Sequence, residues 1–395
     1  MNINHIYIIY VVLWPLISTL FLPIDAAGRM YMILACITLL YNINKSTFIS
    51  TIKITPIVVW LFWGIYVAII WLLIGKNSTN LNSTGFIFLK IFLPIISMIV
   101  SCCETRKNPH KFIIFLFCIY FIYVVIGVLF EKESSTEFDR GGTLLGNSLP
   151  LTAVCCCFIA SLCEHKGWIN KYILFTCFAL AMICILTTAT RKAFFALFIV
   201  VILRYIAKNK TLNLGSFIKL SFFGLVIYII VTTILNNSLI GERFFEAASN
   251  ENKFNSTNNA FLELLGDRAI FYIEGWELFL QNPIWGIGLR NFMVDFNYLH
   301  PIHSEFMVQI SETGIIGTTL YIFFYISTIK LILRTKGNNC NSNVFLIMLG
   351  YIMTILFISL TSWIYEFSRY YVIFGLIIGY SSYLINSRNE NSTHN

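Results

Sequence analysis

Apolar runs long enough to cross a bilayer recur along the chain from its first residues to its last. They lie at approximately 6–24, 27–43, 54–74, 86–103, 112–130, 147–163, 171–188, 192–207, 216–235, 310–333, 344–361 and 369–386. A helix needs roughly 20 such residues to span the hydrocarbon core. The core helices of soluble proteins do not follow one another as such long apolar runs. The pattern therefore predicts an all-α polytopic membrane protein with about 12 transmembrane helices.

One long polar stretch, residues 236–304, interrupts the apolar pattern. We therefore divide the chain into spans at 1–235, this loop, further spans at 305–386 and a tail at 387–395. Within the loop, the stretch from Phe261 to Gln281 has helical periodicity, and Asn282-Pro283 predicts its end. One predicted face holds Phe261, Leu264, Leu265, Tyr272, Trp276 and Phe279, and the opposite face holds Glu263, Asp267, Glu274 and Glu277. This amphipathic helix is expected on or near the top of the bundle.

The basic residues predict which side of the membrane the loop faces. With the N-terminus inside, the cytoplasmic segments hold fifteen basic residues: Lys45, Lys53, Arg106, Lys107, Lys111, Lys166, Lys171, Arg204, Lys208, Lys210, Lys219, Lys330, Arg334, Lys336 and Arg388. The short outer loops hold seven: Arg29, Lys76, Lys132, Arg140, Arg191, Lys192 and Arg369. Since cytoplasmic loops are enriched in Lys and Arg, both termini are expected inside and the loop outside. In a Gram-negative cell this is a multi-pass inner-membrane protein whose loop is periplasmic.

The composition agrees with a membrane protein and excludes other classes. Only 12% of residues are charged, about half the share of a soluble domain. The net charge of +8 comes from basic residues scattered through short loops, which membrane topology explains better than nucleic-acid binding. None of the eleven cysteines falls in a predicted outer loop, so a disulfide framework is not expected.

Cationic side chains on the outer side are candidates for substrate binding. Arg268 projects from the middle of the predicted apolar face, away from the carboxylates. It is either a snorkelling or internally paired arginine, or a guanidinium directed inward to hold a phosphate. Arg191 and Lys192 sit between two apolar runs at the outer boundary. They either snorkel to the interface or face a polar cavity.

A second set of candidates follows the helix stop. Gly286-Ile287-Gly288-Leu289-Arg290 forms a glycine turn that lacks the third glycine of a dinucleotide fingerprint. His300-Pro301-Ile302-His303-Ser304-Glu305 then leads into the tenth span. Because Pro301 disfavours a helix and no third ligand is evident, we do not expect a metal site. A histidine at an outer pocket suits proton transfer, and Glu305 and Glu312 either assist it or are simply solvated.

The same residues carry a resemblance to the superfamily of O-antigen polymerases and ligases. It rests on Gly266-Asp267-Arg268, on Trp276, on Asn282-Pro283-Ile284-Trp285-Gly286 through Phe292, on His303-Ser304-Glu305, and on Glu312-Thr313-Gly314-Ile315-Ile316-Gly317. The segment from Thr187 to Phe195 resembles the family's outer arginine motif, with Arg191 at the arginine position. The family often has Asn where this chain has Ser304, which leaves the contact of that side chain open.

The resemblance implies a GT-C-like fold and an inverting glycosyl transfer, without metal or cofactor, from an undecaprenyl diphosphate-linked glycan. His303, Arg268 and Arg191 would be catalytic, and Arg290, Lys192, Ser304 and Glu305 would bind substrate. A polymerase uses a lipid-linked repeat unit as acceptor, and a ligase uses lipid A-core; a chain-length regulator is a further expected partner. The Gly141-Gly142-Thr143 and Gly146-Asn147-Ser148 segment is similar to a turn of polymerase-like members, so polymerase is preferred over ligase. A flippase or transporter of lipid-linked sugars is the alternative of another class.

Overall fold

The computed structural model describes the backbone of residues 2–20, 24–74, 88–129, 148–188, 191–209, 269–295, 302, 304–336, 343–360, 362 and 364–393. Regular structure in these ranges is helical, with no strand. The elements are α1 (Ile3–Leu20), α2 (Ile24–Asn42), α3 (Ser46–Ile52), α4 (Thr55–Ile74), a π-helical turn η1 (Phe88–Phe92), α6 (Leu93–Lys107), α7 (Pro109–Leu129), α8 (Ser148–His165), α9 (Lys171–Thr188), α10 (Arg191–Asn209), α14 (Ala269–Gln281), α15 (Asn291–Asp295), α16 (Glu305–Arg334), α17 (Val344–Ser359) and α18 (Ser368–Thr393).

The predicted all-helical membrane architecture is confirmed, but the count of twelve spans is not. Among the described residues, three helices are long and apolar enough to cross a membrane, namely α4, α7 and α16. The bent pair α2 and α3 raises the number to four if it forms one span. Four other predicted spans correspond to shorter apolar helices, such as the 16-residue α17, which is below the length that a bilayer requires. The predicted ninth span, 216–235, lies outside the described residues.

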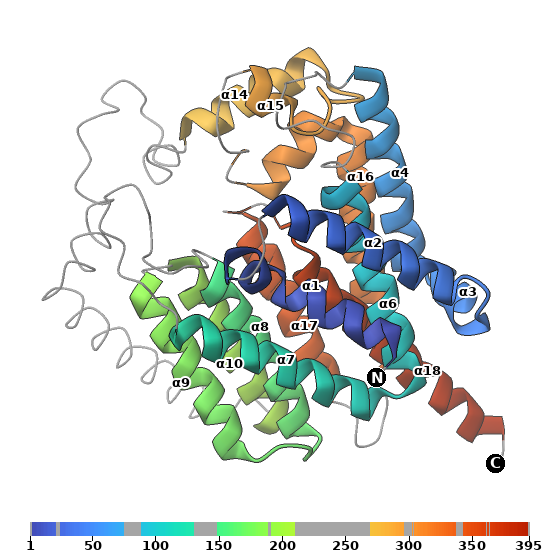
Figure 1. Cartoon of the computed structure of the whole chain (residues 1–395), viewed down its shortest axis with the longest axis vertical. Helices are drawn as coiled ribbons and strands as arrows, with labels where there is room; N and C mark the ends of the chain where they lie inside the picture. Colours follow the sequence, from blue (N-terminus) through green and yellow to red (C-terminus); the bar gives the residue numbers. More distant parts are fainter. Residues whose placement is uncertain are drawn as a thin grey trace, which may run out of the picture.

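The bundle has two ends, which side-chain contacts define. At the N-terminal end, Asn4 donates to Glu104 at 2.6 Å and Asn42 donates to Asn4 at 2.6 Å, which joins the beginning of α1 to the last turns of α2 and α6. At the other end, which we call the turn end, Asn291 donates to the carbonyl of Ile74 at the end of α4. Figure 1 shows α14 and α15 gathered at the turn end, over α16 and far from the C-terminus.

Helices α6 and α18 pack closely because their facing residues are small. A Cβ on Gly375 would lie 2.8 Å from the Cβ of Ser101, and one on Gly379 would lie 2.7 Å from the carbonyl oxygen of Cys102. The two glycines are four residues apart and therefore face the same neighbour. Ser101 also donates to the carbonyl of Val372 at 2.6 Å. Helices α6 and α18 therefore form a closely packed pair within the bundle.

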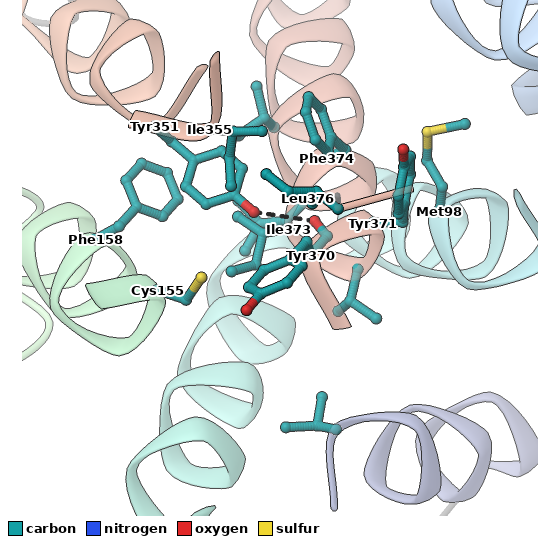
Figure 2. Close-up of a cluster of buried hydrophobic side chains, with 14 of the residues drawn as sticks. Met98, Cys155, Phe158, Tyr351, Ile355, Tyr370, Tyr371, Ile373, Phe374 and Leu376 are labelled. Atoms are coloured by element: carbon teal, nitrogen blue, oxygen red, sulfur yellow. Dashed lines mark hydrogen bonds between the residues drawn. The ribbon is translucent and has the colours of Figure 1, made fainter. Parts of the chain in front are cut away.

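An aromatic cluster joins α18 to α17 and α8. Figure 2 shows the Tyr351 ring between Phe158 and the residues of α18, with its hydroxyl directed at the Tyr370 backbone. That hydroxyl donates to the Tyr370 carbonyl at 3.1 Å, and the Tyr351 and Phe158 rings lie 4.9 Å apart. All three residues are at most 2% exposed. The start of α18, and the loop before it, is therefore held against a rigid core.

Candidate active site

The glycine turn that follows α14 docks onto a break in helix α16. As predicted, α14 ends at Gln281, immediately before Asn282-Pro283. In α16, Gly314 has φ 63° and ψ −167°, which interrupts the helix. Backbone groups of the turn pair with those around the break: Ile287 N–H donates to Ser311, Gly288 N–H donates to Glu312, and Ile315 N–H donates to Pro283, at 3.0, 2.9 and 2.9 Å respectively. The turn thereby satisfies polar groups that the broken helix leaves without helical partners.

Two glycines make this backbone contact sterically feasible. Gly286 has φ +72°, and a Cβ there would lie 2.5 Å from the Glu312 carbonyl oxygen and 2.6 Å from the Gly314 nitrogen. A Cβ on Gly314 would in turn lie 2.5 Å from the Gly286 nitrogen. Real Cβ atoms do not approach so closely, so each glycine is required by the other. The Gly286 and Gly314 positions in the sequence, 28 residues apart, form one structural unit.

Arg290, at the end of the turn, is buried inside a network of charges. Its backbone has φ +68°, an uncommon conformation for a residue with a side chain, and its N–H donates to Glu312 Oε2 at 2.9 Å. Its guanidinium forms an ion pair with Glu366 and donates to Met293 Sδ at 2.9 Å. Lys90 Nζ pairs with the other Glu366 oxygen at 2.8 Å. Glu366 therefore holds two cations that come from distant parts of the chain.

The ionisation of this network follows from its geometry. Burial raises the pKa of Glu366, but the Lys90 and Arg290 charges lower it, and the net result is a pKa below the ordinary value of 4.5. Burial lowers the pKa of Arg290, whereas Glu366 raises it, and the net result is a raised pKa. Both charges are therefore present at neutral pH. The side chains of Arg290 and Glu366 are only 7% and 1% exposed, so each charge depends on its protein partners.

The beginning of α16 carries two more of the predicted site residues. Ser304 is the N-cap of α16, and its hydroxyl accepts a hydrogen bond from Met307 N–H at 3.4 Å. Glu305 is fully buried, and its Oε2 accepts from Ile364 N–H at 2.6 Å. The contact of the Ser304 side chain, left open by the sequence, is thus a helix cap, and Glu305 is not solvated.

Several of these residues meet one segment, residues 360–366, between α17 and α18. Lys192 near the start of α10 donates to Ser362, Glu305 accepts from Ile364, and Arg290 pairs with Glu366. From α14, the Tyr272 hydroxyl donates to the Leu360 carbonyl at 2.8 Å. The segment thus connects α10, α14, the turn and α16. Three residues expected to bind substrate, Lys192, Glu305 and Arg290, are brought to neighbouring positions by it.

Comparison with known families agrees with this assembly. Residues 176–322 match the family model described as O-antigen ligase. This part of the chain is similar to members of the O-antigen ligase family. It runs from α9 to the middle of α16 and includes α10, α14, the glycine turn and the break at Gly314. The resemblance to the superfamily of O-antigen polymerases and ligases is confirmed, which supports an enzyme that acts on lipid-linked glycans. A comparison with curated proteins finds no match.

Within the matched residues 176–322, α14 packs through a different face from the predicted one. Phe271, Gly275 and Leu278 face the bundle, and Leu278 is 6% exposed. Trp276 was expected on the packed face but is 48% exposed. The reason is that α14 is apolar on two sides, and only the side that offers Gly275 allows close approach: a Cβ there would lie 2.8 Å from Ile302 Cδ1. The position of Gly275, and not the number of apolar residues on each face, determines which face of α14 packs against the bundle.

The remaining predicted site residues are only partly placed. Arg268 and His303 lie outside the described residues, and Arg191 begins α10 with its side chain undescribed. Within the ranges that the structure describes, no group of three His, Cys, Asp or Glu side chains could hold a metal ion.

Two charged members of the site were missed from sequence. Lys90 and Glu366 were not among the expected site residues, although they complete the Arg290 network. A signal for Lys90 was available, because a lysine within the predicted span 86–103 is an intramembrane charge that calls for a partner.

Proposed function

We propose that this chain is a glycosyltransferase that polymerises undecaprenyl diphosphate-linked O-antigen repeat units at the periplasmic face of the inner membrane. The observation that carries the proposal is the match of residues 176–322 to the O-antigen ligase family, over the elements that build the turn end. The proposed reaction inverts the anomeric centre and uses no metal. An acceptor hydroxyl attacks the anomeric carbon as the bond to the diphosphate oxygen breaks, and the hydroxyl proton passes to a base.

In this proposal, His303 is the base, and Arg268 and Arg191 stabilise the diphosphate leaving group. Developing negative charge on the leaving group calls for fixed cations, and an attacking hydroxyl calls for a group that titrates near neutral pH. The surroundings of these residues support the assignment. Ile302, fully buried, packs on Gly275 of α14, and Ser304 caps α16, so the residues on both sides of position 303 are held beside α14.

We assign a supporting role to Arg290 and Glu305 in the same reaction. Arg290 is 6% exposed and Glu305 is fully buried, and both are held by the 360–366 segment. In this proposal they position the turn and the start of α16 and do not contact the glycan. Lys192 contacts the same segment from the start of α10, and Ser304 caps the start of α16. Substrate contacts would then come mainly from Arg191, Arg268 and His303.

Substitution tests these roles directly. Arg268→Ala and His303→Ala should each abolish product formation without loss of membrane insertion, because their side chains serve the substrate. A matched control is Arg334→Ala, since Arg334 is an exposed arginine in the last turn of α16, far from the turn end. Glycan length profiles in a complemented deletion strain give the readout. Normal profiles with Arg268→Ala would identify that residue as a snorkelling side chain.

The second candidate is an O-antigen ligase, which the description of the matching family favours. Both enzymes need the same donor chemistry and differ in acceptor. The glycolipids of a deletion strain distinguish them. Lipid A-core with a single repeat indicates a lost polymerase, whereas bare core with long chains on undecaprenyl lipid indicates a lost ligase. Purified protein given a lipid-linked repeat unit should release undecaprenyl diphosphate; translocation without bond formation would instead indicate a transporter.

A further inference from the structure

A second polar site lies at the N-terminal end of the bundle, opposite the turn end. A cavity of about 280 Å³ opens between α3, α6 and α18. Its lining residues are Thr47, Arg106, Lys107, Tyr383, Asn386 and Ser387. The lining therefore has two cations, three hydroxyl groups and an amide, and it includes no carboxylate. Such a lining suits an anion with several acceptor oxygens.

Arg106 is held in place by neutral partners and keeps its charge available. Its Nη1 donates to Ser50 Oγ at 3.0 Å and to Thr51 Oγ1 at 2.9 Å, both on α3. Among the described residues, no carboxylate forms an ion pair with Arg106. Lys107 differs, because its Nζ pairs with Glu104 at 2.8 Å. A half-buried guanidinium oriented by hydroxyl groups is suited to bind a phosphate in a fixed direction.

The rim of the cavity has the character of a membrane interface. Helix α3 turns away from α2 by 108°, so the two helices do not form one straight span. It buries Phe48 and leaves Ile49 48% exposed, close in sequence to the cavity residue Thr47 and to Ser50, which accepts from Arg106. Just before it, Lys45 Nζ lies 2.9 Å from the centre of the Tyr41 ring. A short helix with an exposed apolar residue, preceded by an aromatic residue and a lysine, is typical of the headgroup region.

We propose that this cavity binds the phosphate of an anionic phospholipid, with Arg106 as its principal contact. The phosphate oxygens accept from Arg106 and the hydroxyl-bearing residues, while the acyl chains lie along the exposed apolar residues Leu40, Ile43 and Ile49. A soluble phosphate compound would use the same cations but would gain nothing from the apolar rim. The site concerns neither the glycan nor its transfer, and it is independent of which glycosyl transfer the turn end performs. Basic pockets between helices at the cytoplasmic side bind lipid headgroups in this way.

Native mass spectrometry of the purified full-length protein tests the proposal. The delipidated protein is titrated with phosphatidylglycerol, with phosphatidylcholine and with inorganic phosphate. We expect phosphatidylglycerol to bind most tightly, and Arg106→Gln to weaken it about fivefold, the effect of one basic residue near a lipid surface. Arg334→Gln is the matched control, because it removes an exposed arginine that does not line the cavity, and it should leave the affinity unchanged.

A second variant separates loss of binding from loss of folding. Asn386→Leu places a larger apolar side chain in the cavity lining and removes no charge, and Asn386 is exposed on α18, so the fold should be retained. It should weaken phosphatidylglycerol binding as Arg106→Gln does, with an unchanged elution volume in gel filtration. Three results would overturn the proposal. Arg106→Gln and Arg334→Gln could bind phosphatidylglycerol with equal affinity, or the wild type could bind phosphatidylcholine as tightly as phosphatidylglycerol. Inorganic phosphate could also compete for the site as strongly as phosphatidylglycerol does.

Discussion

Replacing Glu366 with glutamine tests how far the turn end depends on its buried charges. The substitution keeps the shape of the side chain but removes the carboxylate that contacts both Lys90 and Arg290. Lys90 can change its position, since its side chain is 28% exposed. Arg290 cannot, since its side chain is 7% exposed and its backbone N–H is held by Glu312. Leaving one member of a buried ion pair without its partner costs about 3–5 kcal/mol.

Thermal unfolding of the purified protein in detergent measures this cost. For a chain of this size, a loss of that magnitude lowers the apparent melting temperature by on the order of 5 °C. Glu164→Gln is the matched control, because Glu164 pairs with Arg204 at 3.0 Å and both side chains are more accessible, at 17% and 21%. Water can replace the lost partner there, so the control should change stability by about 1 kcal/mol or less.

A double variant shows whether the charge itself is responsible. If Glu366→Gln destabilises by leaving the Arg290 cation without compensation, then Arg290→Met in the same chain should recover part of the loss, because both charges are then absent. The reasoning is refuted if Glu366→Gln and Glu164→Gln have the same melting temperature. It is also refuted if the double variant loses as much stability as its two single substitutions lose together.

Three further predictions concern the same end of the molecule. Gly286→Ala should destabilise by several kcal/mol more than Gly167→Ala; both glycines have φ +72°, but a Cβ on Gly167 meets nothing within 4 Å, so their difference in melting temperature isolates the contact with α16. Ser304→Ala should lower the stability by about 1 kcal/mol through loss of the α16 cap, whereas Ser304→Asp should retain most of the stability that the cap provides. Equal melting temperatures of the two variants would contradict this. Because Glu366 has a lowered pKa, its contribution to stability is present at neutral pH and is lost as the pH falls through that value, below 4.5. Melting curves at decreasing pH should show this extra loss in the wild type and not in Glu366→Gln.

The parts of the fold that the sequence predicts are those with local causes. Long apolar runs predict the helices, and Asn282-Pro283 predicts the end of α14, because proline cannot continue a helix and its neighbour is restricted too. The tenth span was expected from about residue 310, and α16 in fact begins at Glu305. An apolar count misses those first residues, since Glu305 and Gln309 are polar although both are fully buried.

The parts that the sequence does not predict depend on contacts between distant residues. Lys90 and Glu366 are 276 positions apart, and no local pattern states that they pair. The break at Gly314 is similar: a glycine in an apolar helix is ordinarily tolerated, and here only the arrival of the 282–290 turn makes the left-handed conformation favourable. The residue types of the site could therefore be chosen from sequence, but its supporting network could not.

The docking of the glycine turn on broken α16 sets limits for protein engineering. Because backbone groups of residues 283–288 bond with those of residues 311–315, the two segments must be transplanted together. A chimera designed to exchange glycan specificity with a homologue should place its crossovers before Asn282 or after Gly317. Crossovers between these positions would combine one parent's turn with the other parent's helix break, and the hybrid would lose its fit wherever the two glycines are displaced by one residue.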